Sequence, residues 1–370
     1  MGLWSTLKEL WQRPSRRFVA WQVELTTRCP LRCRMCIRQG LDSWGGLDMD
    51  FDCFRSLSPF FRHVEHVVLE GWGEPLTYPH LLDAVRLVKG QGARAGFVTS
   101  GYGLTRDFSA ELLRAGLDFI GFSLAGATAP THEAIRIHSN HDQILQVIQD
   151  IEAIKRAGKL PTPQIHIVYL MLRDNLDEIP LLLETAHRIG VADVLLINLI
   201  HVTTPWQDQQ RLFHCEQHED VAILQEADVL AESLGIRLRR AAVTPQPTAV
   251  CAENPLDNLY ISVSGEVSPC VYLCPPARSP FHRIFCGTRY TLEKQTFGNI
   301  FETPFEQIWK RPDYIEFRRC FAERKNAPLR QSNIVPLSFT DSLQPRNRSS
   351  APTLPSPPES CRTCHKMLGV

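Results

Sequence analysis

Short apolar runs alternate with longer amphipathic runs from residue 18 to about residue 200, and this alternation restricts the fold more than any other feature. Several apolar runs are hydrophobic at successive positions, as strands are when both of their faces are covered. Because such strand–helix–strand units form right-handed parallel crossovers, the repeat predicts an α/β fold, either a barrel or an open sheet. The predicted strands are 18–25, 64–70, 94–100, 117–124, 165–172 and 192–199. The predicted helices between them are 50–62, 79–91, 105–116, 141–157 and 176–189.

The alternation weakens after residue 200, which indicates a different kind of structure in the last part of the chain. A polar segment at 201–218 precedes a helical run, a hairpin at 259–271 and a helix at 306–319. Residues 326–360 are rich in Pro, Ser, Asn and Arg and show little periodicity, as flexible linkers do. We therefore expect an N-terminal segment at 1–17, a β/α core at 18–240, an extension at 241–325, a flexible insertion at 326–360 and a cysteine-containing end at 361–370.

The charge balance and the apolar pattern exclude two classes of partner. The chain has 40 Lys and Arg against 40 Asp and Glu, so it lacks the basic excess of a general nucleic-acid binder. It has no run of about 18 uncharged apolar residues, so we expect no membrane span and no membrane partner. The 12 cysteines are too scattered for a small secreted disulfide scaffold and too clustered to be only buried thiols. Their grouping indicates metal chemistry.

Cys29, Cys33 and Cys36 follow the first predicted strand in a Cys-x3-Cys-x2-Cys pattern. Reactive groups of parallel α/β folds lie at the carboxyl ends of the strands, and three thiolates in one loop can converge on a soft metal centre. A structural zinc ion needs a fourth ligand, whereas a [4Fe–4S] cluster held by three cysteines leaves one iron open. We interpret the pattern as the ligands of an open-iron cluster. A zinc site that borrows a distant fourth ligand is the alternative.

Two later strand ends carry glycines or polar side chains. The second strand ends in Glu-Gly-Trp-Gly-Glu, where Gly71 and Gly73 let a ligand approach the backbone and Glu74 can accept from an ammonium group. The fourth strand ends in Phe-Ser-Leu-Ala-Gly, which contains Ser123, and Arg136 follows in the next helical segment. A tight turn before a helix is the alternative explanation of the glycines, and an ordinary surface arginine is the alternative for Arg136.

These residues together resemble the radical S-adenosylmethionine (SAM) superfamily, which implies an α/β fold of the partial (β/α)6 barrel type. The resemblance implies that Cys29, Cys33 and Cys36 hold a [4Fe–4S] cluster whose open iron binds SAM. Met35 stands where the family usually has an aromatic residue, and Ala125 where it usually has Asp. The SAM contacts that the resemblance implies are Gly71, Gly73, Glu74, Ser123 and Arg136.

Four further cysteines, Cys251, Cys270, Cys361 and Cys364, can converge if the Pro/Ser-rich stretch loops out. Loop-closure entropy rises slowly with length, so an insertion of roughly 35 residues before Cys361 is tolerable. The region resembles the SPASM/twitch extension of radical SAM maturases, which implies a second, auxiliary [4Fe–4S] cluster in a small extension rich in loops and hairpins. Structural zinc on the same four thiolates is the alternative. Cys274 is an alternative ligand to Cys270 or a thiol on the substrate side.

The resemblance implies a radical SAM oxidoreductase or maturase that cleaves SAM reductively and abstracts a hydrogen atom from a substrate. The implied partners are a peptide, protein or small-molecule substrate and an electron donor such as flavodoxin or ferredoxin. Oxygen-sensitive clusters and reduced thiols predict a cytoplasmic location. A non-catalytic metal or redox protein that uses the cysteines structurally is the alternative. His201, His214 and His218 could contact substrate or serve as a base, but their polar segment favours solvated loop positions, so no catalytic acid or base is assigned.

Overall fold

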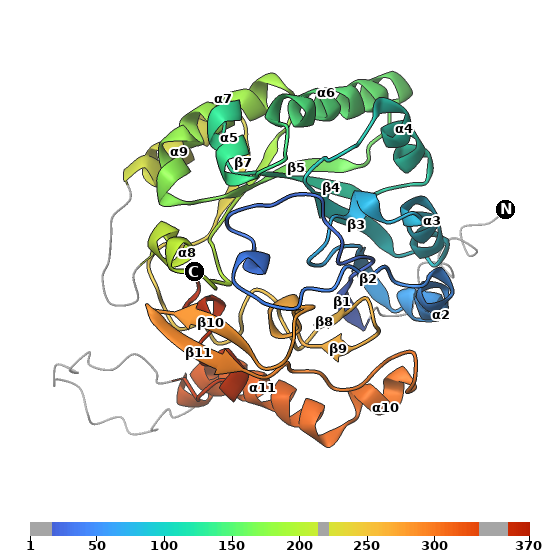
Figure 1. Cartoon of the computed structure of the whole chain (residues 1–370), viewed down its shortest axis with the longest axis vertical. Helices are drawn as coiled ribbons and strands as arrows, with labels where there is room; N and C mark the ends of the chain where they lie inside the picture. The colour runs from blue at the N-terminus through green and yellow to red at the C-terminus, as the bar shows by residue number, and fades with distance from the viewer. Residues whose placement is uncertain (1–16, 214–221, 333–353) are drawn as a thin grey trace, which may run out of the picture.

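The computed structural model describes residues 17–213, 222–332 and 354–370. Its main feature is a nine-stranded sheet in which β1 to β8 run parallel and β9 pairs antiparallel with β8 (Figure 1). The strand order is β7-β6-β5-β4-β3-β2-β1-β8-β9, so the sheet is not closed. This arrangement confirms the predicted partial β/α barrel. The strands are β1 (Phe18–Val23), β2 (Val64–Val68), β3 (Arg94–Thr99), β4 (Phe119–Leu124), β5 (Gln164–Leu170), β6 (Asp193–Ile197), β7 (Arg237–Arg240), β8 (Asn258–Ile261) and β9 (Val267–Ser268).

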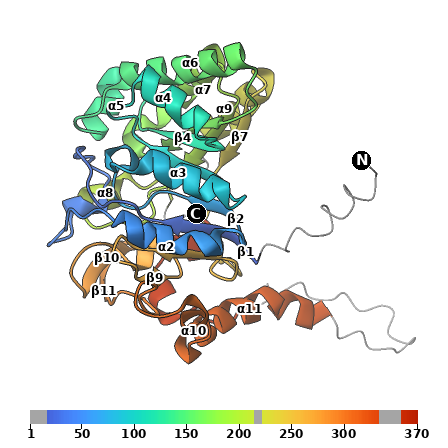
Figure 2. The same cartoon turned by 90° about the vertical axis from the view of Figure 1, so that its right-hand side faces the viewer.

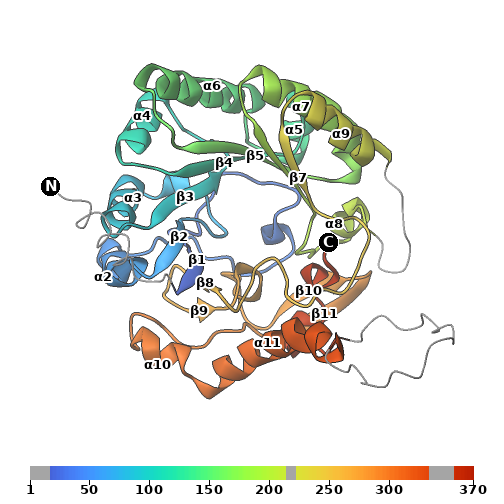
Figure 3. The ribbon, with the colours of Figure 1, turned by 180° about the vertical axis from the view of Figure 1, so that it is seen from behind.

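Helices connect the first seven strands, and most of them cover the outer face of the sheet, as Figure 3 shows from behind. Leu81, Val85 and Val88 are buried at helical spacing in α3, which explains its packing on the sheet. Several helices begin at a side-chain cap, and the Asp50 carboxylate accepts from two backbone N–H groups at the start of α2. The helices are α2 (Phe51–Phe61), α3 (Leu81–Gly90), α4 (Arg106–Arg114), α5 (Ala129–Ile135), α6 (His141–Gly158), α7 (Ile179–Arg188), α8 (Pro205–Gln210) and α9 (Ala222–Ser233).

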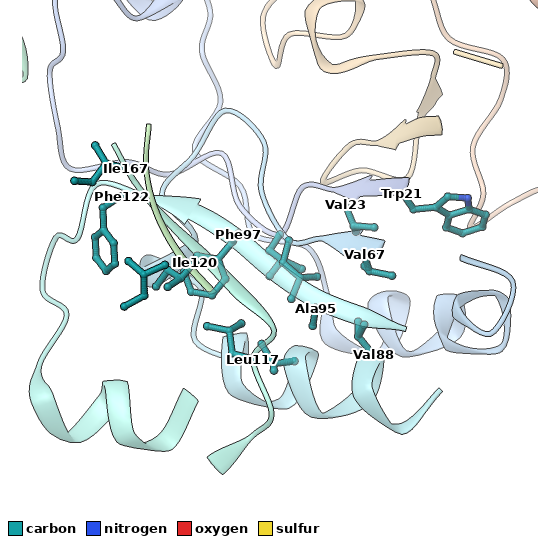
Figure 4. Close-up of a cluster of buried hydrophobic side chains, with 14 of the residues drawn as sticks. Trp21, Val23, Val67, Val88, Ala95, Phe97, Leu117, Ile120, Phe122 and Ile167 are labelled. Carbon is teal, nitrogen blue, oxygen red and sulfur yellow. The ribbon is translucent and has the colours of Figure 1, made fainter. Parts of the chain in front are cut away.

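The hydrophobic core lies between the sheet and these helices, and Figure 4 shows part of it. Trp21, Phe97 and Phe122 are fully buried there, together with aliphatic residues of neighbouring strands. Burial of a side chain such as Phe97 contributes about 1.5–3 kcal/mol relative to exposure. This core fixes the strands from outside and leaves their carboxyl ends to position the loops.

The extension continues the sheet of the core. The predicted hairpin at 259–271 is present as β8 and β9, and β8 also pairs in parallel with β1. A two-stranded sheet of β10 (Phe281–Phe285) and β11 (Thr288–Leu292) follows. Helices α10 (Phe305–Trp309) and α11 (Pro312–Ser332) lie at the opposite end of the molecule from α6 and α7 (Figure 2).

Several details differ from the sequence prediction. The short edge strand β7 was not expected, because its sequence, Arg-Leu-Arg-Arg, has no apolar run. The predicted helix at 306–319 is two helices, and the second begins with Pro312, which suits the first turn of a helix. This helix extends to Ser332, and 333–353 of the predicted insertion lie outside the described residues. Across the parts of the chain that the structure describes, no helix is long and apolar enough to cross a membrane.

Candidate cluster and cofactor site

The loop after β1 carries the first cysteine group across the centre of the ring of strands (Figure 1). The Cys36 backbone N–H donates to the Cys33 carbonyl over 3.0 Å, which makes a tight turn between the last two cysteines. The guanidinium of Arg38 donates to the Cys29 carbonyl over 3.1 Å and also to the Leu31 carbonyl. The positive charge of Arg38 therefore lies within the loop that presents the three thiols.

Neighbouring elements hold this loop from two sides. The backbone N–H groups of Arg32 and Arg34 donate to carbonyls at the end of α5, over 3.0 and 2.9 Å. The buried Gln207 amide of α8 donates to the carbonyls of Arg34 and Cys36, over 3.1 and 3.0 Å. Sequence reasoning missed Gln207. The Thr204-x-x-Gln207 pattern marks a capping box, and both of its hydrogen bonds are present. The pattern does not reveal that the same Gln207 side chain also contacts the cysteine loop.

The glycine–glutamate loop after β2 lies directly against the cysteine loop. The Glu74 backbone N–H donates to the Arg28 carbonyl over 2.8 Å. The Glu74 side chain is 3% exposed, and its carboxylate accepts from the Thr99 hydroxyl and from the N–H and hydroxyl of Ser100, the last two over 2.8 and 2.6 Å. Gly73 allows this contact, because a Cβ atom there would lie 2.2 Å from the Thr26 carbonyl oxygen.

A cavity of about 260 Å³ opens between these loops and the ends of β3 and β4. It brings together every residue that the sequence predicts for the first cluster and for SAM. The Arg136 guanidinium enters it from the end of α5, and its Nε is buried without a hydrogen-bond partner among the described residues. The predicted residues that line the cavity are Cys29, Cys33, Cys36, Gly71, Gly73, Glu74, Ser123 and Arg136, and Met35 lines it as well.

Burial and nearby charge act in opposite directions on the thiols. Burial raises the pKa of Cys29 to about 11, although the charge of Arg38 acts to lower it. Burial also raises the pKa of Cys33, against the charges of Arg136 and Arg38. Burial therefore favours the protonated form of Cys29 and Cys33, and coordination to a metal would release their protons.

A second carboxyl group, Glu70, also lines this cavity. Burial raises the pKa of Glu70 to about 7, and its carboxylate accepts from the Val98 N–H over 2.6 Å. Glu70 and Cys270 both line a further cavity of about 160 Å³, so this carboxyl group faces both cysteine-lined cavities. Sequence reasoning missed Glu70, whose signal was its position as the last residue of the predicted strand 64–70, two residues beyond the end of β2.

The side chains that line the first cavity are of the kinds that hold an iron–sulfur cluster. In residues 17–213, 222–332 and 354–370, no group of three or more His, Cys, Asp or Glu side chains is arranged to hold a single metal ion. The side chains offered at the first site are three thiols, which are soft ligands. The unpartnered Arg136 guanidinium offers hydrogen bonds to an anionic group beside them. Three thiols with a cationic side chain fit a cluster and the carboxylate of SAM.

The second cysteine group is assembled from three distant parts of the chain. Cys251 precedes β8, Cys270 follows β9, and Cys361 and Cys364 belong to the C-terminal segment. Burial raises the pKa of Cys270, and the nearby Glu253 and the other three thiols raise it further. Cys274 lies apart from this set, because its Sγ is 3.8 Å from a Glu266 carboxylate oxygen and its electrostatic neighbours are Glu266, Lys294 and Glu24.

Of the three histidines in the polar segment, His201 is not a solvated loop residue. It is 3% exposed, and neither of its ring nitrogens has a hydrogen-bond partner in the described part of the chain. Its ring lies 5.9 Å from Trp72 and 6.3 Å from Tyr272, between the first cavity and the loop after Cys270. The prediction of a solvated position was wrong for His201, since the extension covers this segment. His214 and His218 lie outside the described residues.

Comparisons with known proteins agree with this geometry. Residues 23–186 match the model of the radical SAM superfamily, and 251–332 match that of SPASM, an iron–sulfur cluster-binding domain. A tungsten-containing aldehyde ferredoxin oxidoreductase cofactor-modifying protein of Pyrococcus furiosus is 25% identical over 299 residues, which cover 80% of this chain and 82% of that protein. An AdoMet-dependent heme synthase of Oleidesulfovibrio alaskensis is 22% identical over 328 residues, which cover 82% of this chain and 77% of that protein.

Solved structures give the same fold. Streptococcus suis SuiB, bound to the precursor peptide SuiA, superposes with a TM-score of 0.57 at 11% identity, over 99% of this chain and 74% of that one. The cysteine-lined cavity at the carboxyl ends of parallel strands, the two domain models and the fold of the solved structure therefore agree with one another. The chain carries a radical SAM domain, of the superfamily whose members bind SAM and a [4Fe–4S] cluster, and a SPASM domain, of the kind that binds auxiliary iron–sulfur clusters.

Proposed function

We propose that this protein is an oxidoreductase or maturase that cleaves SAM reductively and abstracts a hydrogen atom from a bound peptide or small molecule. The single observation that carries the proposal is the cavity of about 260 Å³, where three thiols face Glu74, Ser123 and Arg136. When bound there, a [4Fe–4S] cluster supplies the electron that splits SAM into methionine and a 5′-deoxyadenosyl radical. The buried walls of the cavity keep water away from so reactive a species.

The residues of the cavity have separate roles in this proposal. Cys29, Cys33 and Cys36 hold the cluster. Arg136 binds the carboxylate of SAM through its free donors, and Ser123 donates a further hydrogen bond. Glu74 is held by Thr99 and Ser100. Its rigid carboxylate orients the methionyl ammonium group, while Gly71 and Gly73 keep the loop close enough for this contact.

The second cysteine group holds an auxiliary cluster in this proposal, with Cys251, Cys270, Cys361 and Cys364 as ligands. The substrate lies between the two cysteine groups, where Glu70 lines both cavities. A peptide substrate is supported by the SuiB structure, which contains a precursor peptide, and a small-molecule substrate by the cofactor-modifying relative. The electron donor is of the flavodoxin or ferredoxin class. The reducing cytoplasm suits both clusters.

Anaerobic reconstitution tests the proposal against a non-catalytic metal protein. The purified chain is treated with iron and sulfide, and SAM and a strong reductant are then added. We expect 5′-deoxyadenosine and about eight irons per chain, as two [4Fe–4S] clusters require. Bound zinc in place of iron, without 5′-deoxyadenosine, contradicts the enzyme proposal.

The variant Arg136→Met is expected to weaken SAM binding while the iron content stays unchanged. The guanidinium has an unpartnered donor in the cavity, and a charge-assisted hydrogen bond contributes about 1.5–3 kcal/mol, which is about 10- to 150-fold in affinity. Anaerobic equilibrium dialysis with labelled SAM measures this loss. Arg106→Met is the matched control, because Arg106 is exposed on α4 and pairs with Asp150. Equal SAM affinity in both variants contradicts the role of Arg136.

A further inference from the structure

Two arginines are buried beside the second cysteine group. Arg283 is 1% exposed on β10, and Arg324 is 3% exposed on α11. In the described part of the chain neither guanidinium forms an ion pair with an Asp or Glu carboxylate. A buried guanidinium without an opposite charge is unfavourable, and arginine is almost never fully buried unless paired. Each of these two side chains therefore needs a source of negative charge.

The contacts of Arg283 place that charge at the C-terminal cysteines. Its Nη2 donates to the Ser360 carbonyl and to the Thr363 hydroxyl, both over 2.9 Å, and these residues flank Cys361. Its Nε is buried without a partner among the described residues. Arg283 thus places a buried positive charge against the segment that carries Cys361 and Cys364.

Arg324 approaches the same cysteine group from α11. Its guanidinium donates to the carbonyls of Thr248, Ala249 and Pro355, and the Ala249 bond measures 3.1 Å. Thr248 and Ala249 precede Cys251 along the chain. Burial lowers the pKa of Arg324, and the charges of Cys361 and Cys251 oppose that shift. Arg283 therefore contacts the segment of Cys361 and Cys364, and Arg324 contacts the segment that leads to Cys251.

A third cation near the group is already neutralised. Lys366 forms an ion pair with Glu253, and its ammonium lies 5.2 Å from the ring centroid of Tyr272. Lys366 and Glu253 together add no net charge. Arg362, between Cys361 and Cys364, is exposed, so the buried positive charge that lacks an acidic partner comes from Arg283 and Arg324.

We propose that Arg283 and Arg324 are the counter-charges of the auxiliary cluster and raise its reduction potential. The inference rests on the proposed function of the second cysteine group as an iron–sulfur site. Four thiolates on an oxidised [4Fe–4S] core leave a net double negative charge, which two guanidinium groups balance. Net charge is one of the factors that set the potential of such clusters. Because reduction adds a further negative charge, nearby cations favour the reduced form.

A redox titration of the full-length chain tests this inference. Cys29, Cys33 and Cys36 are replaced by Ala so that only the auxiliary cluster contributes to the electron paramagnetic resonance signal. In this background Arg283→Gln and Arg324→Gln are each expected to disfavour the reduced cluster at least tenfold, a shift of about 59 mV to more negative potential. The double variant is expected to shift further than either single variant. Arg319→Gln is the matched control on α11, because Arg319 is exposed and pairs with Glu316 and Glu323.

Lysine variants separate the charge from the hydrogen bonds. Arg283→Lys and Arg324→Lys keep the charge but cannot make all the contacts of a guanidinium, and we expect potentials close to the parent. Potentials of the Gln variants equal to that of Arg319→Gln overturn the inference. The Gln variants could lose their iron, and the Lys variants then decide the question. If the Lys variants keep both their iron and the parent potential, the charge role is supported. If the Lys variants lose as much iron as the Gln variants, the charge role is overturned. A parent chain that binds zinc at the second group contradicts the proposed function instead, before any arginine is changed.

Discussion

The triple variant Cys29→Ala, Cys33→Ala, Cys36→Ala is expected to form no 5′-deoxyadenosine and to keep about half of its iron. All three thiols line the cavity of about 260 Å³, whereas the second cysteine group is assembled by the extension. Loss of three thiolates removes one [4Fe–4S] cluster and leaves the other, which means about four irons per chain. Iron and sulfide analysis after anaerobic reconstitution gives the count, and chromatography of the quenched reaction detects 5′-deoxyadenosine.

Cys53→Ala is the control for the loss of a thiol as such. Cys53 lies on α2, does not line the cavity and is half-buried. We expect this variant to keep about eight irons and full SAM cleavage. If the triple variant retains all of its iron, the three cysteines are not cluster ligands. If it loses all of its iron, the second group does not hold a cluster independently.

The parallel sheet could be predicted from the sequence because each buried strand is a local feature. The runs at 94–100 and 117–124 contain β3 and β4, whose centres are fully buried. The cysteine loop and the glycine–glutamate loop follow β1 and β2, which are neighbours in the sheet. Adjacent parallel strands bring the loops at their carboxyl ends together. The sequence therefore also predicted which residues meet in the first cavity.

The contacts that support the site could not be predicted, since they join residues far apart in the chain. Glu24 is fully buried, and its carboxylate accepts from the N–H groups of Trp72 and Val263 over 2.8 and 3.2 Å. Gln207 supports the cysteine loop from α8. A glutamate at a strand end or a glutamine in a helix has no periodicity that reveals such a partner. These residues show their role only when the tertiary fold is known.

The second cysteine group could be predicted from the sequence only in part. The Cys-x2-Cys pair at the end of the chain is a local pattern, but its distance from Cys251 and Cys270 depends on the fold. Arg283 fixes this segment through Ser360 and Thr363. Cys270 and Cys274 are four residues apart, so the sequence alone could not decide which of them is a ligand together with Cys361 and Cys364. In the structure the Cys274 thiol contacts Glu266 instead.

Gly73→Ala is expected to lower SAM cleavage by about 100-fold, the effect of about 1 Å of misplacement in an active site. A Cβ at this position would lie 2.2 Å from the Thr26 carbonyl oxygen and 2.7 Å from that of Arg28. These are backbone atoms of the cysteine loop, so no side chain can rotate away. Relief of the clash must separate the loops and break the 2.8 Å hydrogen bond from Glu74 N–H to the Arg28 carbonyl. Denaturant unfolding of the iron-free chain is expected to show a loss of about 3 kcal/mol.

Gly90→Ala is the matched control, because no heavy atom lies within 4 Å of a Cβ at this last residue of α3. Alanine is favoured over glycine in a helix by about 1 kcal/mol, so this variant is expected to be at least as stable as the parent and equally active. The contrast isolates the effect of close backbone approach from that of losing a glycine. If Gly73→Ala matches Gly90→Ala in stability, iron content and SAM cleavage, the two loops do not need their contact, and Glu74 cannot depend on it for its position.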